Sequence, residues 1–485
     1  MESPGVIAAK TDGEKRPTVE AAIAGRPLPD SSSGDQQRRS LPHISVLGGG
    51  MAGLAAGYYA KKNGLPFAVY EAAKRVGGNC LTLTHGDFRF DSGAHRFHDK
   101  EPAVTREVTD LLGEALERVE VPSRCYYDGK SVDFPLSPLN LLVSLGWYRF
   151  ARAATEVLSS RLRNHRPSQD FESFARNTYG PTVARRFLLN YSEKLWGLPC
   201  RELSPEVAGQ RLKGLDLKTF VIEALRGKKA KTQHLDGAFH YPRLGIGTVA
   251  ETFARHCGPE NIRTDSAITR VFHNHTRIQA VEINGRSRID VQDVVSTLPL
   301  PRFLEMMDPS PPPEILDLAR GLHFRDVILV ALFLERPSVT DAATVYFPSA
   351  EFPFTRVYEP RNRSTRMSPP GRTSLVAEIP CDEKDPRGEG TGQTELVETV
   401  RARLIEIGWI RKSEILDSTV MRMKCAYPVL ALDTQYRIAR ITAFLDRFAN
   451  LRVTGRNGHF RHAFIHDVIR LGGQAVGELT SASRK

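Results

Sequence analysis

The feature that most constrains this chain is a glycine-rich segment, V-L-G-G-G-M-A-G, at Val46–Gly53. A short β-type run, His43–Leu47, leads into it, and an alanine-rich run of helical pattern, Met51–Lys62, follows. A second β-type run, Phe67–Tyr70, ends beside the acidic residue Glu71, eighteen residues after the last glycine. This order of strand, Gly-x-Gly-x-x-Gly, helix, strand and acid is typical of a βαβ unit that binds a dinucleotide.

Each residue of this pattern has a physical role in such a unit. Gly48 makes the tight turn, Gly50 lets the backbone approach a pyrophosphate, and Gly53 packs the helix against the strand. The N-terminus of the helix offers N–H groups and a positive dipole to the phosphates. Glu71 would accept hydrogen bonds from the ribose hydroxyls of the adenosine.

The residues after Glu71 indicate which dinucleotide is bound. They read Ala-Ala-Lys-Arg-Val-Gly-Gly-Asn, so that Arg75 can pair with the cofactor phosphates, and Gly77 and Gly78 let the chain pass close to the cofactor. Paired glycines alone would also fit a flexible turn. Together with the βαβ unit, however, the segment resembles the FAD site of the amine-oxidase and protoporphyrinogen-oxidase flavoproteins, and FAD is the predicted cofactor.

Composition narrows the functional classes. The 485 residues are 41% hydrophobic and 25% charged, which is ordinary for a globular enzyme of two interleaved domains. The net charge of +11 suits an acidic ligand, but no stripe of Lys and Arg is interleaved with aromatic residues, so no nucleic-acid partner is predicted. The six cysteines are scattered without a C-x-x-C pair, which indicates reduced thiols in a cytoplasmic protein and neither a metal nor a disulfide framework.

Two segments bear on membranes and disorder. Residues 1–40 are rich in Pro, Ser, Gly and charge and lack the apolar core of a secretory signal, so a disordered tail is predicted. No run has the length of a membrane span, and no stable membrane insertion is expected. Trp147–Arg163 has the pattern of a basic amphipathic helix, which could lie on a membrane or pack with a solvated face.

The order of patterns along the chain predicts a mixed α/β fold. A βαβ unit opens the chain, helices and a separate antiparallel sheet interrupt it, and a glycine-bearing strand, loop and helix close it. We therefore expect a Rossmann-like FAD-binding domain built from discontinuous segments, with substrate elements inserted between them. The predicted parts are the tail at 1–40, the FAD-binding domain at 41–100, 235–300 and 425–485, a mainly helical region at 101–234, and an antiparallel substrate sheet at 301–424.

A more specific resemblance runs from about Leu41 to the C-terminus. Seven short blocks, in order, resemble those of the UDP-galactopyranose mutases, a branch of the wider amine-oxidase FAD superfamily. The blocks are Phe90–Phe97, Tyr191–Pro199, Phe239–Gly247, Asp293–Pro299, Val345–Pro348 followed by Arg356, Ala426–Pro428 and Gly455–Gly458.

The resemblance implies an isomerase that interconverts pyranose and furanose forms of a nucleotide-sugar through an adduct between the sugar and N5 of the reduced flavin. NAD(P)H could reduce the flavin, although the chain has no second nucleotide fingerprint. An arginine suits the diphosphate because it is always charged and bonds two oxygens at once.

The implied site residues fall into three sets. The catalytic set is His95, Tyr346, Arg356 and Tyr427, and the substrate-binding set is Tyr191, Trp196, Tyr346, Arg356, Tyr427 and His462. The cofactor-binding set is Gly48, Gly50, Met51, Ala52, Gly53, Glu71, Ala72, Arg75, Gly77, Gly78, Asn79, His95, Val271, Gly455, Arg456 and Asp467.

The chain also departs from the mutase pattern. Leu189 stands where related mutases place a second diphosphate arginine, and Arg185 and Arg186 lie about a helical turn away. His462 follows Arg461 where the family often has tyrosine. These losses leave open a different nucleotide-sugar, or an FAD oxidoreductase of the amine-oxidase and protoporphyrinogen-oxidase type that removes hydride from its substrate. An FAD-stabilised binding module is the third alternative.

Each singled-out residue also has a purely structural interpretation. Arg356 could form an ordinary surface ion pair, and Tyr346 and Tyr427 could be core tyrosines whose hydroxyls are satisfied. His95 could be a structural histidine that bonds the backbone. His459, His462 and His466 have no Cys or acidic neighbour except Asp467, so no metal site is predicted there.

Overall fold

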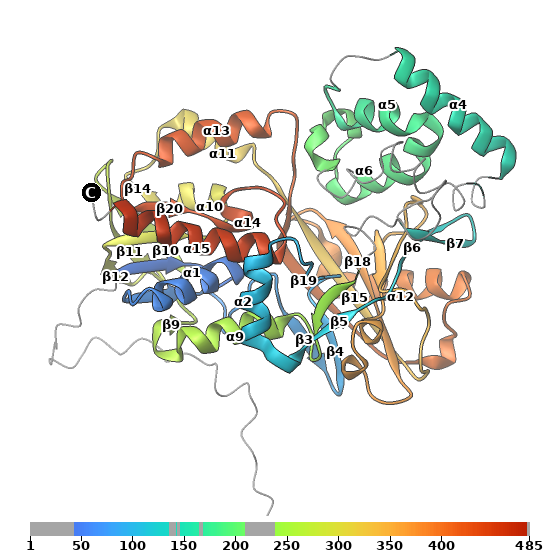
Figure 1. Cartoon of the computed structure of the whole chain (residues 1–485), viewed down its shortest axis with the longest axis horizontal. Coiled ribbons are helices and arrows are strands. Elements are labelled where there is room, and N and C mark those ends of the chain that lie inside the picture. The colour runs from blue at the N-terminus through green and yellow to red at the C-terminus, as the bar shows by residue number, and fades with distance from the viewer. Residues whose placement is uncertain (1–42, 135–141, 143–145, 164–167, 209–237, 483–485) are drawn as a thin grey trace, which may run out of the picture.

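A parallel sheet of five strands, in the order β20-β13-β1-β2-β9, collects distant parts of the chain (Figure 1). The computed structural model describes residues 43–134, 142, 146–163, 168–208 and 238–482, so the predicted tail lies outside the described residues. The strands are β1 (Ile44–Leu47), β2 (Phe67–Tyr70), β9 (Ile262–Arg263), β13 (Asp293–Ser296) and β20 (Leu451–Val453). The predicted Rossmann-like sheet from discontinuous segments is confirmed.

Both faces of this sheet are covered, as parallel sheets require. Ile44 and Val46 are fully buried against the helices of one face, whereas Leu47 and Val294 are buried against the other face. The first face carries α1 (Met51–Lys62), α9 (Gly247–Cys257) and α15 (Ile465–Ala482). The second face carries a sheet of β10 (Ile268–His273), β11 (Ile278–Ile283), β12 (Ser287–Asp290) and β14 (Met307–Asp308), with α10 (Leu300–Glu305), α11 (Pro313–Arg320) and α13 (Thr434–Leu445).

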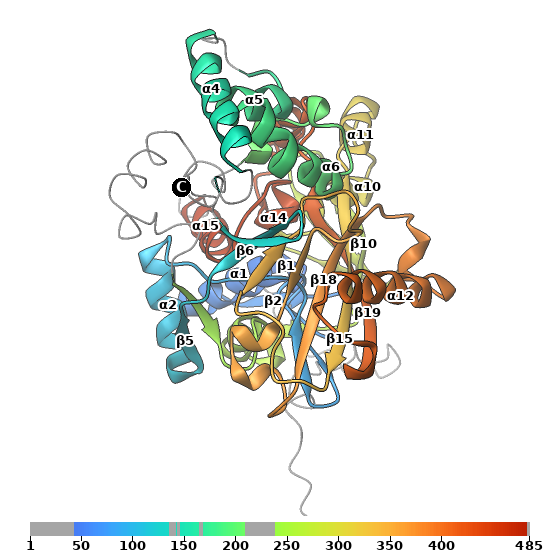
Figure 2. The same cartoon turned by 90° about the vertical axis from the view of Figure 1, so that its right-hand side faces the viewer.

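A second large sheet has seven strands in the order β19-β15-β18-β17-β16-β6-β7, and all of its pairs are antiparallel except β16 with β6. Its strands are β6 (Ser123–Tyr127), β7 (Lys130–Phe134), β15 (Phe324–Leu334), β16 (Thr344–Tyr346), β17 (Arg356–Tyr358), β18 (Thr373–Cys381) and β19 (Ile415–Pro428). Buried Leu396, Val400 and Leu404 of α12 (Thr391–Glu406) pack against it (Figure 2).

The sequence patterns predict the central strands of this sheet but miss β19. Strands β15 and β18 are almost wholly buried, so their apolar runs are clear. Strand β19 lies at the edge, and most of its side chains are exposed or half-buried. Charged residues such as Arg422 and Lys424 on this strand hide its β pattern, as is common for edge strands.

A group of helices stands over the edge of the seven-stranded sheet near β6 and β7 (Figure 1). The helix predicted at Trp147–Arg163 is α4 with those bounds. The amphipathic run Phe171–Trp196 divides into α5 (Phe171–Val183), a π-helix at Ala184–Leu189 and α6 (Asn190–Trp196). Gly180, with φ 75°, and Pro181 kink α5, because proline cannot continue the helical hydrogen bonds.

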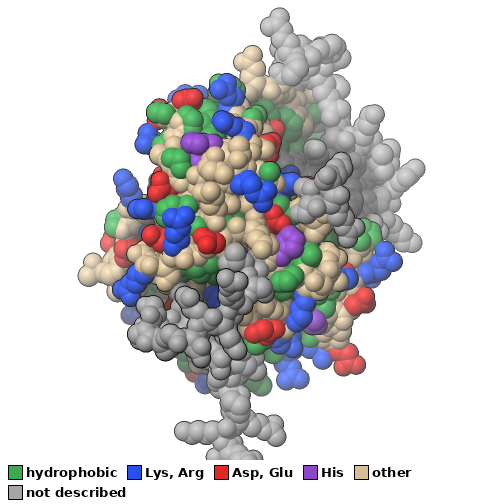
Figure 3. All heavy atoms as spheres, turned by 90° about the vertical axis from the view of Figure 1, so that its left-hand side faces the viewer, with side chains coloured by type: hydrophobic (Ala, Val, Ile, Leu, Met, Phe, Trp, Pro, Cys, Tyr) green, Lys and Arg blue, Asp and Glu red, His purple; other side chains and the backbone are tan. Residues whose placement is uncertain are grey.

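Shorter elements connect these units. They are β3 (Thr82–His85) paired with β4 (Phe88–Asp91), α2 (Pro102–Leu112), β5 (Leu116–Val119) paired with β8 (Phe239–Pro242), and α14 (Gly455–Gly458). None of the helices in the described part of the chain combines the length and the apolar character that a membrane crossing needs. On the face shown in Figure 3, basic and acidic side chains are interspersed and form no continuous patch of one sign.

The substitution Gly53→Ala tests whether the fold needs the close packing of α1 on β1. A Cβ at Gly53 would lie 1.9 Å from the carbonyl oxygen of Gly48. We expect Gly53→Ala to cost more than about 3 kcal/mol in the free energy of unfolding and to abolish FAD retention. Urea unfolding and the ratio of flavin to protein after desalting measure both effects.

Gly477→Ala is the matched control, because Gly477 also lies in a helix and a Cβ there would meet nothing within 4 Å. It should keep its flavin and change stability by no more than about 1 kcal/mol. Equal behaviour of the two variants would contradict the packing argument.

Candidate active site

A cavity of about 840 Å³ extends from the carboxyl ends of β1 and β2 to the seven-stranded sheet. Gly48 and Glu71 line one end, and Tyr346 and Arg356 line the other. A crevice outside the carboxyl ends of parallel strands is where open α/β sheets bind their ligands. One continuous site therefore brings the glycine motif and the predicted substrate residues together.

The glycine end is organised around the Glu71 carboxylate. One of its oxygens accepts a hydrogen bond from Gly49 N at 2.7 Å, and the other accepts one from Ala73 N at 2.9 Å. Gly77 N donates to Gly49 O at 2.9 Å, so the loop after β2 lies directly against the glycine motif. These contacts fix the turn before α1 and hold its N-terminus toward the cavity.

The residues present fit an elongated dinucleotide. Gly48 and Gly77 have φ values of 101° and 122°, which L-residues with a side chain rarely adopt, so the backbone itself forms the wall of the cavity. Asn457 also lines the cavity, and its buried Oδ1 has no hydrogen-bond partner in the described part of the chain. A buried acceptor of this kind needs a ligand donor.

Most predicted cofactor residues line the cavity and four do not. Those that line it are Gly48, Gly50, Met51, Ala52, Glu71, Ala72, Gly77, Gly78, Asn79, His95, Gly455 and Arg456. Gly53 lies one turn into α1, and Val271 is fully buried in the β10 sheet. Arg75 turns instead to Thr82 O at 3.3 Å and to Glu251 at 3.6 Å. Asp467 accepts a hydrogen bond from Phe464 N at 2.8 Å and caps the start of α15.

Arg356 is the centre of the other end. Strand register places it opposite Tyr346 on β16 and Glu378 on β18. Its Nε donates to Glu378 Oε2 at 2.6 Å and its Nη2 donates to the Tyr427 hydroxyl at 2.7 Å. Burial is the largest single effect and opposes the charged form, but Glu378 together with the nearby tyrosines outweighs it and raises the pKa of Arg356 well above its usual value. Arg356 is therefore a buried, charged residue and not a surface ion pair.

Glu378 fixes the position of Arg356 through their ion pair. Its other carboxylate oxygen accepts a hydrogen bond from Ala94 N at 2.6 Å. Arg356 lines the cavity and its Nη1 makes no hydrogen bond to the described residues, so this nitrogen remains available to a ligand.

Aromatic rings complete the wall around Arg356. The ring of Tyr346 lies 6.0 Å from that of Tyr191 and 5.0 Å from that of Phe134. The ring of Tyr427 lies 5.9 Å from that of Trp196 and 6.5 Å from that of His462. All six residues of the predicted substrate set therefore line one part of the cavity.

His95 lies at the middle of the cavity wall. Its Nε2 is 3.3 Å from Ser92 Oγ, and that hydroxyl donates to Asn79 O at 2.8 Å. Burial lowers the pKa of His95 to about 3, and the charges of Arg356 and Arg456 add to this effect. The ring is therefore neutral at neutral pH and can hold a hydrogen bond, but it is a weak base.

Two ionisable residues, the buried Asp91 and the half-buried Lys194, support the site although the sequence did not single them out. The Asp91 carboxylate accepts hydrogen bonds from Thr82 Oγ1 at 2.8 Å, Tyr241 Oη at 2.5 Å and Ile246 N at 3.0 Å. Burial raises the pKa of Asp91 despite these bonds. Asp91 and Lys194 each lie in one of the sequence blocks that resemble the mutases. Their place in these blocks is the signal that could have identified them.

Lys194 attaches α6 to the loop after β16 by hydrogen bonds. Its Nζ donates to four backbone carbonyls, at 2.7 Å to Phe347, 2.8 Å to Ser349, 3.1 Å to Phe352 and 2.9 Å to Phe354. Burial lowers the pKa of Lys194 to about 7, against an opposing effect of Glu351. Tyr191 and Trp196 lie on the same helix, so this contact sets their positions over the cavity.

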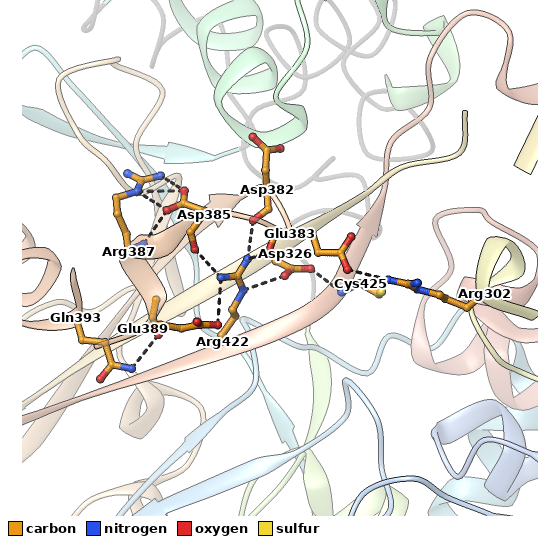
Figure 4. Close-up of polar contacts among 11 residues, drawn as sticks. Arg302, Asp326, Asp382, Glu383, Asp385, Arg387, Glu389, Gln393, Arg422 and Cys425 are labelled. Carbon is orange, nitrogen blue, oxygen red and sulfur yellow. Dashed lines mark hydrogen bonds and ion pairs between the residues drawn. The ribbon is translucent and has the colours of Figure 1, made fainter. Parts of the chain in front are cut away.

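A network around Arg422 fixes the strand that carries Tyr427 (Figure 4). Arg422 Nε donates to Asp326 Oδ2 at 2.9 Å, and its Nη atoms donate to carbonyls of the loop 382–385. The other oxygen of Asp326 accepts Cys425 N at 2.9 Å. Cys425 has φ 50° at an irregularity in the β15–β19 pairing, and this bend turns Tyr427 toward the cavity.

The family model described as flavin-containing amine oxidoreductase matches residues 51–476. Protoporphyrinogen oxidase 2 of Arabidopsis thaliana is 32% identical over 104 residues, which are 21% of this chain and 20% of the relative. The chain thus matches only about a fifth of the length of the plant oxidases. Coproporphyrinogen III oxidase of Bacillus subtilis is 21% identical over 369 residues, 70% of this chain and 77% of the relative.

Among solved structures, a reduced UDP-galactopyranose mutase superposes with a TM-score of 0.79 at 18% identity, covering 92% of this chain and 95% of that one. Cyclohexylamine oxidase from Brevibacterium oxydans IH-35A gives a TM-score of 0.64 at 15% identity, with 92% and 100% covered. At these identities the likeness establishes the shared fold.

The depressed pKa of His95 predicts a specific acid sensitivity. The unfolded chain takes up a proton near pH 6.5 and the folded chain takes it up only near pH 3, so unfolding becomes easier as the pH falls between these values. We expect wild type to lose about 2 kcal/mol more than His95→Gln in unfolding free energy between pH 7.5 and pH 5. Parallel urea titrations at the two pH values measure this difference, and identical pH dependence of the two proteins would contradict it.

Proposed function

Because the chain belongs to the flavin-containing amine oxidoreductases, we propose that it is an FAD-dependent oxidoreductase whose substrate carries phosphate or carboxylate groups. FAD is the cofactor, and when bound it supplies the acceptor for hydride. The observation that carries this proposal is the positive charge of the cavity lining. The basic side chains that line the cavity are Arg96, Lys100, Arg356, Lys424 and Arg456.

The same cavity offers no counter-ion to a protonated amine. Among its described lining residues Glu71 is the only carboxylate, and both of its oxygens are engaged by backbone N–H groups at the glycine end. Glu378 lies behind Arg356 and is already paired with it. A cation would therefore find no free carboxylate among the described lining residues, whereas an anion meets Arg356 Nη1.

The protein residues would bind and orient the substrate. Arg356 would hold an anionic group by charge-assisted hydrogen bonds, with the Tyr346 and Tyr427 hydroxyls beside it. The rings of Tyr191 and Trp196 would exclude water and pack on the apolar part of the substrate. His95, which is neutral, would hold a hydrogen bond without adding charge.

Carboxylated tetrapyrroles are one class of substrate that meets these requirements, and relatives of this chain include protoporphyrinogen and coproporphyrinogen oxidases. A second candidate is isomerisation of a nucleotide-sugar. The cluster of Tyr346, Arg356 and Tyr427 favours it, because a permanently charged guanidinium bonded to one tyrosine hydroxyl, with a second tyrosine opposite it in the sheet, suits a diphosphate. Leu189 argues against the isomerase, because this apolar residue stands where related mutases place a second diphosphate arginine.

Anaerobic mixing of the FAD-loaded protein with each substrate class separates these functions. We expect coproporphyrinogen III or protoporphyrinogen IX to bleach the oxidised flavin in the absence of oxygen. A UDP-hexose isomer of unchanged mass, formed only by the reduced protein, would instead establish the isomerase. Faster bleaching by putrescine or cyclohexylamine than by any anion would contradict the proposal.

Arg356→Lys tests the role of the arginine in whichever reaction is found. Lysine keeps the charge beside Glu378 but loses the fork, so we expect kcat/KM to fall about a hundredfold with FAD retained. Arg286→Lys, a change at an exposed turn far from the cavity, is the matched control and should be neutral. An unchanged kcat/KM in Arg356→Lys would remove the arginine from substrate binding.

A further inference from the structure

A second cavity, of about 570 Å³, lies among α4, the kinked α5, the π-helix and the β6–β7 hairpin (Figure 1). Its lining shares no residue with that of the FAD cavity. The π-helix separates the two: Phe187 lines the FAD cavity, whereas Arg186 lines the second cavity. The second cavity is therefore a separate space from the one that the flavin would fill.

Four arginines and one carboxylate line this second cavity: Arg152, Arg176, Arg185, Arg186 and Glu156. Glu156 is already saturated, because it accepts Thr182 N at 2.9 Å, Thr182 Oγ1 at 3.0 Å and Arg152 Nε at 3.0 Å. Burial raises the pKa of Glu156, but the bonds from Thr182 and Arg152 outweigh burial and bring it below its usual value. The carboxylate is therefore ionised and neutralises Arg152.

Arg176 is also compensated, whereas the two arginines of the π-helix are not. Arg176 pairs with Glu172 at 2.8 Å. Arg185 is exposed, and no carboxylate among the described residues pairs with it. Arg186 lies with its guanidinium 5.8 Å from the ring centre of Tyr127, and its Nη1 is buried with no hydrogen-bond acceptor among the described residues.

An orphaned, buried cationic donor is costly, so its retention points to a ligand that supplies the acceptor. The local backbone supports this interpretation. Arg185 and Arg186 lie in the π-helix Ala184–Leu189, and single π turns persist mostly where function compensates for their poorer hydrogen bonding.

We propose that the second cavity binds a phosphorylated small molecule. A phosphate group carries close to two negative charges, which match the uncompensated charges of Arg185 and Arg186, and guanidinium forks bond phosphate oxygens in pairs. The Tyr127 and Tyr148 hydroxyls and the Asn190 amide line the same space and add neutral donors. The ring of Tyr127 also packs 5.0 Å from that of Phe187, which links the occupant to the wall of the FAD cavity.

Inorganic pyrophosphate is the probe, titrated calorimetrically into the FAD-loaded full chain. We expect saturable binding by wild type and at least about a thirtyfold loss of affinity in the double variant Arg185→Gln, Arg186→Gln. The double variant Arg286→Gln, Arg440→Gln removes the same charge at exposed positions away from the cavity and should bind as wild type does. Flavin content and melting temperature verify that each variant is folded.

Three results would overturn the proposal. Wild type that shows no saturable binding has no such site. Equal weakening in both double variants would show that pyrophosphate responds to overall charge. A loss of affinity in Arg356→Lys, with the Arg185, Arg186 variant unaffected, would place the anion in the FAD cavity.

Discussion

The buried ion pair between Arg356 and Glu378 is the interaction on which the far end of the cavity depends. Taking both charges out of water is expensive, and their attraction offsets that cost only when the remaining donors and acceptors are satisfied. Here Glu378 also accepts Ala94 N, and Arg356 also donates to Tyr427. The pair thereby joins the segment after β4 to β17, β18 and β19, four parts of the chain that are far apart in sequence.

This arrangement explains why the two ends of the cavity have different chemistry. At the glycine end the backbone forms the wall of the cavity, and the Glu71 carboxylate accepts hydrogen bonds from backbone N–H groups. At the sheet end a charged guanidinium is held in place with one nitrogen left for a ligand. Lys194 and Arg422 each donate hydrogen bonds to several backbone carbonyls. Lys194 thereby positions the helix that carries Tyr191 and Trp196, and Arg422 positions the strand that carries Tyr427.

The sequence predicts the elements whose signals are local. The glycine spacing, the continuous apolar runs of β15 and β18 and the amphipathic pattern of α4 are each signals from residues within a few positions of one another. Strand β19 and the π-helix were missed, since an edge strand loses its apolar pattern and a π turn has none.

The sequence names candidate site residues but does not give their contacts. The six residues of the predicted substrate set line one cavity, and their role in binding substrate stays a prediction. The partner of Arg356 comes from strand register across 22 residues, which no local pattern indicates. Spacing also cannot determine where a long side chain turns, and Arg75 lies against Thr82 and Glu251 instead of lining the cavity.

The most direct test of the central claim, that the far end of the FAD cavity selects anions, is a difference-spectrum titration of the bound flavin. UDP is compared with uridine, which lacks only the diphosphate, and both are compared with putrescine. The account predicts that UDP perturbs the flavin at a concentration at least about tenfold lower than uridine does, and that putrescine has no effect. Equal responses to UDP and uridine, or a saturable response to putrescine, would contradict it.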